Sequence, residues 1–185
     1  MTVGALTIPA SSQTVGPYFR IGLEYLIERA PEVTTGAEGT IEIRGRVLDR
    51  DGAPVPDAML EFWAGEPSAP ALNNNGYPAG FTRAATDDDG NFTLVANRPT
   101  ALAFGVGRMQ APHLLVLVFA RGLNRHLITR VYFNDETSNA ADPVLEAVPT
   151  ERRDTLIAQL DGNLSRSYRW NVVLQGQDET VFFAW

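Results

Sequence analysis

The stretch 111–133 constrains the fold more than any other part of the sequence. Leu114–Phe119 is a run of six apolar residues rich in β-branched and aromatic side chains, which predicts a strand buried on both faces. Gly122 and Asn124 follow, and both residue types tolerate positive φ, so we expect the chain to turn there. Leu127–Phe133 alternates in its second half and is predicted to be the partner strand of a central hairpin.

Short β-type segments separated by turn residues lie on both sides of this hairpin. Strands are predicted at 40–48, 58–63, 81–86, 91–96, 168–174 and 180–183. Thr150 is a plausible N-cap for one short late helix that runs to Leu160, with Gly162 just past its end. Residues 66–80 and 134–149 are predicted to be long loops. Many short strands with one late helix favour a mainly β fold, and a β-sandwich in particular.

Composition limits the class of protein further. At 185 residues, the chain is expected to form one domain over 36–185, preceded by an arm over 1–35. It has no cysteine, which excludes disulfides and thiolate chemistry. A formal charge of −7 argues against nucleic acid, because no basic run is available to neutralise phosphates. No apolar stretch is long enough to span a membrane, and the first residues do not resemble a secretory signal, so we expect a cytoplasmic location.

The arm contains the sequence Ser-Ser-Gln-Thr-Val-Gly-Pro-Tyr-Phe at 11–19. Pro17 has no N–H to donate, so the segment cannot continue a helix or a central strand. Small and aromatic residues packed closely in a leading arm favour docking on another surface. An arm lying on its own core explains the same pattern equally well.

Residues able to carry chemistry are few. The chain has two histidines, and no nucleophile elbow, phosphate loop or histidine pair at metal-binding spacing. His113, beside a proline at a strand entrance, is more typical of a structural residue than of a ligand, and His126 is most simply a surface residue. Three consecutive carboxylates at 87–89 favour a solvated turn over a calcium site, because the calcium-loop spacing is absent. The residues alone therefore do not assemble an active site.

A series of motifs nevertheless resembles one enzyme family, the intradiol ring-cleavage dioxygenases. The resemblance covers about residues 10 to 185, and the arm, the Phe-Ala-Arg-Gly turn and the C-terminal stretch are most similar to the alpha chain of its two-chain members. The motifs are the arm at 12–18, Gly-Arg-Val-Leu-Asp at 45–49, Pro-Asp-Ala at 56–58, Leu-Glu-Phe-Trp at 60–63, Thr-Asp-Asp-Asp-Gly-Asn-Phe at 86–92, Ala-Pro-His at 111–113, Phe-Ala-Arg-Gly at 119–122, Val-Tyr-Phe at 131–133 and the C-terminal stretch at 176–183. The resemblance implies a prealbumin-like β-sandwich.

The family's iron site is where this sequence departs from the pattern. The resemblance implies a non-haem Fe(III) held by two tyrosinates and a His-x-His pair, hard donors suited to that ion. His113 matches the first histidine, but Leu115 replaces its partner. No tyrosine follows Arg98-Pro99 before Tyr132, and Tyr77 is the sole candidate for the other tyrosinate. We therefore predict that the chain binds no iron, that His113 is a remnant of a ligand position, and that a partner beta chain holds the Fe(III).

The resemblance also implies a role in the partner's active site. Carried over by position, Thr14, Gly16, Pro17 and Arg121 would line the substrate pocket of the beta chain, with Tyr18 as a weaker candidate. Gly16 would let backbone come close, Pro17 would form a rigid wall, and Arg121 would supply a positive charge. Without the resemblance, an exposed hairpin arginine is the simpler interpretation of Arg121.

The expected activity is that of the assembly and not of this chain alone. The alpha and beta chains, in a higher hetero-oligomer, would cleave protocatechuate with O2 to 3-carboxy-cis,cis-muconate in the β-ketoadipate pathway of aromatic catabolism. One alternative is a prealbumin-like binding or interaction module without enzymatic context. A second is an enzyme acting on catechol or hydroxyquinol, although those family members are usually self-sufficient chains with all four ligands.

Overall fold

The strands account for most of the regular structure. The computed structural model describes residues 11–14, 16, 22, 39–65, 78, 80–162 and 166–184. The strands are β1 (Thr40–Leu48), β2 (Met59–Ala64), β3 (Phe81–Ala85), β4 (Asn91–Asn97), β5 (Leu102–Ala103), β6 (Met109–Gln110), β7 (Leu114–Phe119), β8 (Leu127–Phe133), β9 (Ile157–Leu160), β10 (Ser167–Arg169) and β11 (Val172–Val173). The helical segments are the 3-10 turns η1 (Thr137–Ala141) and η2 (Thr150–Leu156) and the short α-helix α2 (Pro143–Ala147).

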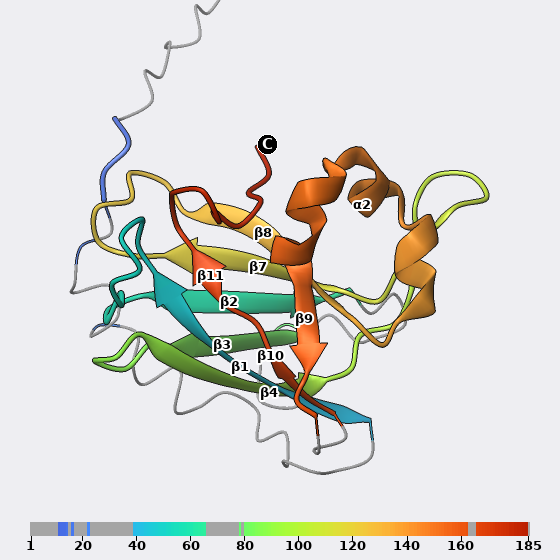
Figure 1. Ribbon diagram of the computed structural model, residues 1–185, viewed down its shortest axis with the longest axis horizontal. Helices are drawn as coiled ribbons and strands as arrows, with labels where there is room; N and C mark the ends of the chain where they lie inside the picture. Colours follow the sequence, from blue (N-terminus) through green and yellow to red (C-terminus); the bar gives the residue numbers. More distant parts are fainter. Residues whose placement is uncertain are drawn as a thin grey trace, which may run out of the picture.

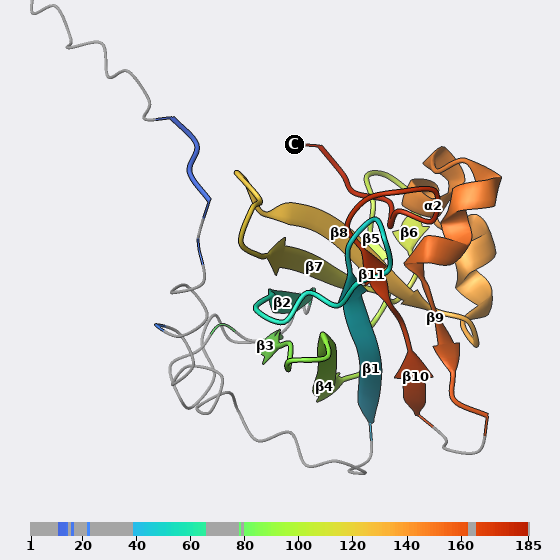
Figure 2. The same cartoon turned by 60° about the vertical axis from the view of Figure 1, so that its left-hand side comes forward.

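The strands form a β-sandwich, which confirms the predicted fold class. One continuous sheet runs in the order β11-β1-β10-β9-β8-β7-β2-β3, and β4 pairs with β1. The sheet bends so that β2, β3, β7 and β8 face β1, β4 and β10 across the core (Figure 1). The β5–β6 ribbon and the helical segments lie together at one end (Figure 2). No helix among the described residues is long and apolar enough to cross a membrane.

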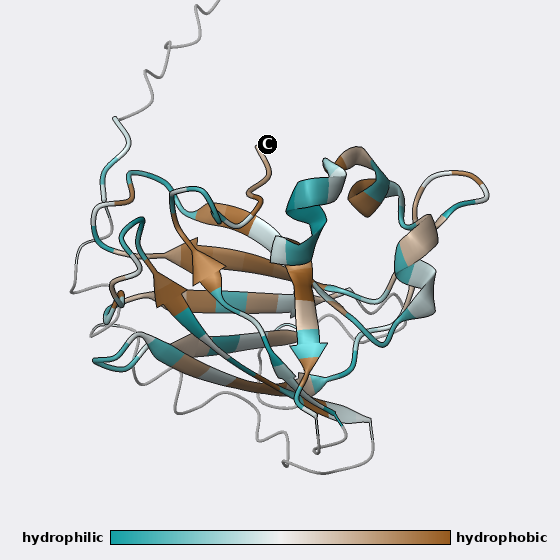
Figure 3. Ribbon diagram, viewed as in Figure 1, coloured by the Kyte–Doolittle hydropathy of each residue, from teal (hydrophilic) through white to brown (hydrophobic). Residues whose placement is uncertain are grey.

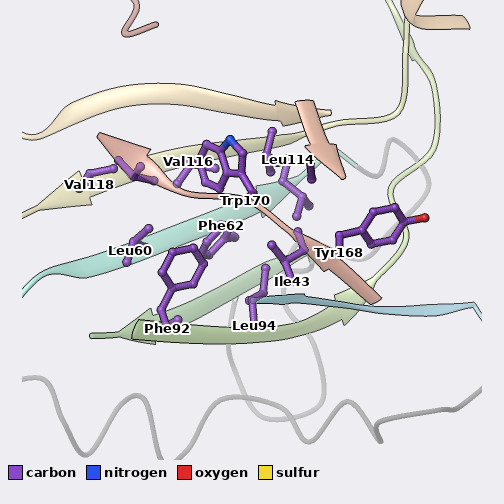
Figure 4. Packing of buried hydrophobic residues seen from close by; sticks show 14 of the residues in the cluster. Ile43, Leu60, Phe62, Phe92, Leu94, Leu114, Val116, Val118, Tyr168 and Trp170 are labelled. Carbon is purple, nitrogen blue, oxygen red and sulfur yellow. The ribbon is translucent and has the colours of Figure 1, made fainter. Parts of the chain in front are cut away.

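The core is built from alternating residues of facing strands. Alternate positions of β4 are buried, as expected for a strand with one face in the core. Apolar residues are concentrated in the strands and polar residues in the turns (Figure 3). Figure 4 shows side chains of both layers meeting in one cluster, which includes Ile43, Leu60, Phe62, Phe92, Leu94, Leu114, Val116, Val118, Tyr168 and Trp170.

The predicted central hairpin is confirmed, with one difference in its burial. Strands β7 and β8 pair antiparallel, from Leu114 opposite Val131 to Val118 opposite Leu127. Only one face of β7 is fully buried, and Leu115, on the other face, is half-buried. The prediction of complete burial on both faces was therefore too strong, because an antiparallel sheet packs on one side and is only partly covered on the other.

The late helix was predicted in the wrong place. Residues 150–156 form a 3-10 turn, and Ile157–Leu160 form strand β9, which pairs with β8 and β10. Thr150 is not an N-cap, because the residue at that position is Pro149 and it makes no side-chain cap. The short helix lies earlier, at Pro143–Ala147, inside the predicted loop. Its N-cap is the buried Asp142, which accepts hydrogen bonds from two backbone N–H groups of the first turn.

The predicted last strand, at 180–183, was also wrong. The segment makes isolated hydrogen bonds and no ladder: Thr180 donates to the carbonyl of Val173 and Phe183 to that of Ile128. The hydroxyl of Thr129 donates to the carbonyl of Val181 at 2.7 Å. The apolar pattern of this segment thus reflects packing against the β8 side of the sandwich, which requires no regular strand pairing.

The acidic turn at 87–89 is structural. The Asp87 carboxylate accepts hydrogen bonds from the backbone N–H groups of Asp89 and Asn91, at 3.0 and 2.8 Å. The side chain of Asn91 also donates to this carboxylate. The bonds from the side chain and backbone of Asn91 are the main causes that lower the pKa of Asp87. The carboxylate therefore closes the β3–β4 turn. The sequence had predicted a turn at these residues.

Candidate functional site

The end of the central hairpin carries an arginine and contacts the arm. The turn between β7 and β8 contains Arg121 and Gly122, and Gly122 has a φ of +85°, the conformation expected from the sequence. The backbone N–H of Gly122 donates to the hydroxyl of Thr14 at 2.9 Å, across 108 residues of sequence. The same hydroxyl is 3.4 Å from the backbone N–H of Gly16. One threonine therefore joins the arm to the turn.

A second contact joins the same two segments. The Nε of Arg125 lies 3.3 Å from the hydroxyl of Ser12. The described part of the arm runs beside the turn in both views (Figures 1 and 2). The structure thus brings together two of the predicted pocket residues, Thr14 and Gly16, with the turn that bears a third, Arg121. Pro17 and Tyr18 lie outside the described residues.

Arg121 is exposed on one side and held on the other. Its side chain is 60% exposed, and its Nε lies 3.1 Å from Oδ2 of Asp57, whose side chain is only 12% exposed. The pairing of β2 with β7 explains this contact. Met59 is opposite Phe119 in the antiparallel register, so continuing both strands by two residues places Asp57 opposite Arg121.

A surface cleft of about 540 Å³ lies next to the turn. The arm, the hairpin and the C-terminal segment all contribute to it: its lining includes Gln13 of the arm, Arg125 and His126 of the turn, and Phe182 and Phe183. His126 is exposed, as predicted, and its ring lies over that of Phe119 with centroids 5.3 Å apart. The side of the hairpin that faces the arm is therefore concave, aromatic and basic.

His113, which the resemblance to the family matches to a ligand position, lies at the opposite end of β7. His113 is 5% exposed, and its Nδ1 is hydrogen-bonded to the carbonyl of Ala111 at 2.7 Å. Its ring stacks on that of Tyr132 at a centroid distance of 5.2 Å. The Tyr132 hydroxyl donates to the buried carboxylate of Asp142 at 3.2 Å and lies 3.2 Å from a guanidinium nitrogen of Arg130.

The donors at this end do not fit a ferric ion. Leu115, where a second histidine would be needed, faces away from the core, opposite Trp63 and Arg130. The hydroxyl of Tyr132 has partners within the chain, Asp142 and Arg130, and burial raises its pKa. Across the described ranges, no three histidine, aspartate or glutamate side chains gather as a metal site. Tyr77 lies outside the described residues.

Arg98, which precedes the expected tyrosine position, has a structural role. Its guanidinium lies 3.1 and 3.2 Å from the two carboxylate oxygens of Asp135 and stacks over the ring of Phe133 at 4.9 Å. It also contacts the hydroxyl of Tyr168. Arg98 thus joins the end of β4 to β8 and β10 and stabilises the sandwich.

The buried His113 predicts a dependence of stability on pH. Burial, followed by the positive charge of Arg130, lowers the pKa of His113, whereas the Ala111 carbonyl and Asp142 act in the opposite direction. As pH falls below the ordinary histidine value of 6.5, the unfolded chain binds a proton that the folded chain resists. We expect the free energy of unfolding to fall by at most about 1.4 kcal/mol per pH unit in that range.

The measurement is urea unfolding at a series of pH values between 7 and 5, for the wild type and two variants. His113→Gln should lose most of the decrease between pH 6.5 and 5, whereas His126→Gln, which alters the exposed histidine, should keep it. Equal pH dependence in the wild type and His113→Gln would show that His113 does not resist protonation.

Two contacts that hold the β7–β8 turn were not predicted from the sequence. Asp57 was noted only within a Pro-Asp-Ala motif, and the hydrogen bond between Thr14 and Gly122 joins residues too far apart for any local pattern to indicate. The position of Asp57 immediately before a strand could have suggested a partner across the sheet, if the pairing of β2 with β7 had been known.

Comparisons with known proteins found clear relatives of this chain. A family model described as Dioxygenase matches residues 28–176. The chain is 42% identical to the protocatechuate 3,4-dioxygenase alpha chain of Burkholderia cepacia, over 93% of this chain and 95% of that one. It is 38% identical to the alpha chain of the same name from Pseudomonas putida, over 93% and 94% of the two chains. It is also 28% identical to the beta chain of the B. cepacia enzyme, over 76% and 66%.

Solved structures agree on the fold. The dioxygenase domain of a dioxygenase–carbohydrate-binding fusion from Streptomyces sp. SirexAA-E superimposes with a TM-score of 0.56 at 24% identity, over 91% of this chain and 99% of that domain. At that identity the likeness concerns the fold alone. The family model covers residues 28–176, and each alpha-chain relative matches 93% of this chain. The chain therefore belongs to the intradiol dioxygenase family.

Proposed function

We propose that the chain is the alpha subunit of a protocatechuate 3,4-dioxygenase and that it binds no iron itself. The observation that carries the proposal is the 42% identity to a curated alpha chain over almost the full length of both proteins. The identity to a beta chain is lower, at 28%. The partner would be a beta chain of related fold, in a higher hetero-oligomer, and we expect the assembly to be cytoplasmic.

The proposed iron-free state is supported by the donor set. Leu115 offers no ligating atom at the position of the second histidine, and no tyrosine lies between Pro99 and Tyr132. Fe(III) held by the beta chain would supply the chemistry of ring cleavage with O2. The alpha chain would contribute only to binding and orienting the substrate.

The segment proposed to do this is the turn that bears Arg121, with the arm residues beside it. Arg121 places a positive charge at the surface, where it would pair with the carboxylate of protocatechuate. Thr14 holds the backbone of the turn through Gly122, so the arm and the arginine would move as one unit. Pro17 and Tyr18 remain proposed members of the same pocket wall. Fixing the substrate in one orientation lowers the entropic part of the barrier.

The proposal is tested by producing this chain alone and together with the beta-type chain of the same organism. We expect the two chains to purify as a complex, and we expect oxygen consumption with protocatechuate, with formation of 3-carboxy-cis,cis-muconate, only from that complex. A beta chain that is equally active alone would contradict the proposed role in the pocket. A chain that forms no such complex would favour the alternative of a binding module without enzymatic context.

A further inference from the structure

Asp57 is a buried carboxylate whose only charged contact in the described part of the chain is Arg121. Both of its carboxylate oxygens are buried, and neither has a hydrogen-bond partner there. The Nε of Arg121 is 3.1 Å from Oδ2, but its N–H is not aligned well enough to count as a hydrogen bond. The attraction between the two side chains is therefore ionic, across a short distance on the buried side of the arginine.

An arrangement of this kind is costly to the fold. A buried carboxylate normally accepts several hydrogen bonds, and one that does not loses hydration without compensation. For comparison, the buried carboxylate of Asp142 accepts hydrogen bonds from three backbone N–H groups. Asp142 is thus satisfied as a helix cap, whereas nothing in the local backbone accounts for Asp57. The contact with Arg121 is therefore the one that can explain why the carboxylate of Asp57 is buried.

The contact with Asp57 engages one edge of the guanidinium. The atom of Arg121 in contact with Asp57 is Nε, and its side chain is 60% exposed, so N–H groups of the terminal nitrogens remain available as further donors. Two terminal N–H groups are the fork that binds a carboxylate in a bidentate manner. On the backbone side, Thr14 accepts the hydrogen bond of the next residue, Gly122. Both the side chain and the backbone of the turn are therefore held from within the chain.

We infer that Asp57 is a positioning residue, which orients the Arg121 guanidinium so that its terminal nitrogens meet the carboxylate of an aromatic acid. The inference rests on the proposed function, because it assumes that Arg121 faces the substrate. The gain is preorganisation: a long side chain that is already oriented loses less rotamer freedom when the ligand binds. Asp57 itself does not touch the substrate.

The test is Asp57→Asn in the assembled enzyme, a change that keeps the shape of the side chain and removes its charge. We expect the KM for protocatechuate to rise about 3- to 10-fold with little change in kcat, because the arginine is less ordered but still present. The inhibition constant of 4-methylcatechol, a neutral competitor without a carboxylate, should be unchanged. A general distortion of the pocket would weaken both ligands.

The matched control is Asp161→Asn. Asp161 pairs with the Nε of Arg169 at 3.1 Å, the same atoms and distance as the Asp57–Arg121 pair, but on strand β10. This variant should leave both constants unchanged. Thermal unfolding of each variant shows that the comparison is made on folded protein. If Asp57→Asn does not fold, Asp57→Ser provides the same comparison with a smaller side chain.

A double variant separates this inference from the proposed function. In an Arg121→Ala background, Asp57→Asn should cause no further rise in KM, since its effect acts through the arginine. If Arg121→Ala raises KM and Asp57→Asn does not, the positioning role of Asp57 is wrong while the proposed function stands. If neither change raises KM, Arg121 does not face the substrate, and the proposed pocket itself is wrong.

Discussion

Gly45→Ala is expected to destabilise the fold strongly. A Cβ at this position would lie 1.6 Å from the backbone carbonyl oxygen of Trp170 and 2.9 Å from the ring of Phe92. The carbonyl belongs to the backbone between β10 and β11, and both strands pair with β1, so it cannot move aside without breaking the sheet. We expect a loss of about 3 kcal/mol or more, a large share of the 5–15 kcal/mol of a typical domain.

The measurement is the midpoint of thermal unfolding, followed by circular dichroism, together with the soluble yield. Gly162→Ala is the matched control, because a Cβ at Gly162 would meet no atom within 4 Å and its φ lies outside the positive region. That variant should unfold within a few degrees of the wild type. A Gly45→Ala protein with an unchanged midpoint would show that β1 and the 170–171 segment are not packed as closely as described.

Arg121→Ala in the assembled enzyme is expected to lower kcat/KM for protocatechuate about 10- to 100-fold, the effect of losing one charge-assisted interaction with a carboxylate. Most of the change should appear in KM, and the iron content should stay at the wild-type level. Inhibition by neutral 4-methylcatechol should change little, since it has no carboxylate to lose contact with. Steady-state oxygen consumption gives both constants.

The control for this variant is Arg169→Ala. Both substitutions remove an exposed arginine whose Nε is 3.1 Å from an aspartate, so they alter net charge and surface pairing equally. Arg169→Ala should keep wild-type kinetics. Because Arg121→Ala leaves Asp57 buried without its cation, the unfolding midpoint of the variant is measured as well. Equal kinetic constants for the two variants would place Arg121 outside the substrate pocket.

Much of the fold could be predicted because strand periodicity is a local property. Strands β1, β4, β7 and β8 were predicted within a residue or two of their bounds. Ile157–Leu160 was not, because its apolar spacing suits a helix face as well as a strand, and pairing with β8 and β10 decides between them. The short helix after Asp142 was missed because it is too short to show a period.

The candidate site, like the fold, could be predicted only in part. The substitution of Leu115 for a ligand is visible in the sequence, and so is the position of Arg121 in a turn. The contacts that hold the turn are not, because Thr14 and Asp57 lie 108 and 64 residues from their partners Gly122 and Arg121. No local sequence pattern indicates a contact between residues so far apart in the chain. Such contacts follow only from the register of β2 against β7 and from the path of the arm.

The iron content of this chain purified alone tests the central claim most directly. With Leu115 in place of the second histidine and no tyrosine between Pro99 and Tyr132, we expect a colourless protein after purification in the presence of Fe(III). Metal analysis should find well under one iron per chain, and the complex with the beta chain should contain one iron per pair. A chain that alone binds one iron and shows a visible tyrosinate-to-iron absorption band would contradict the account.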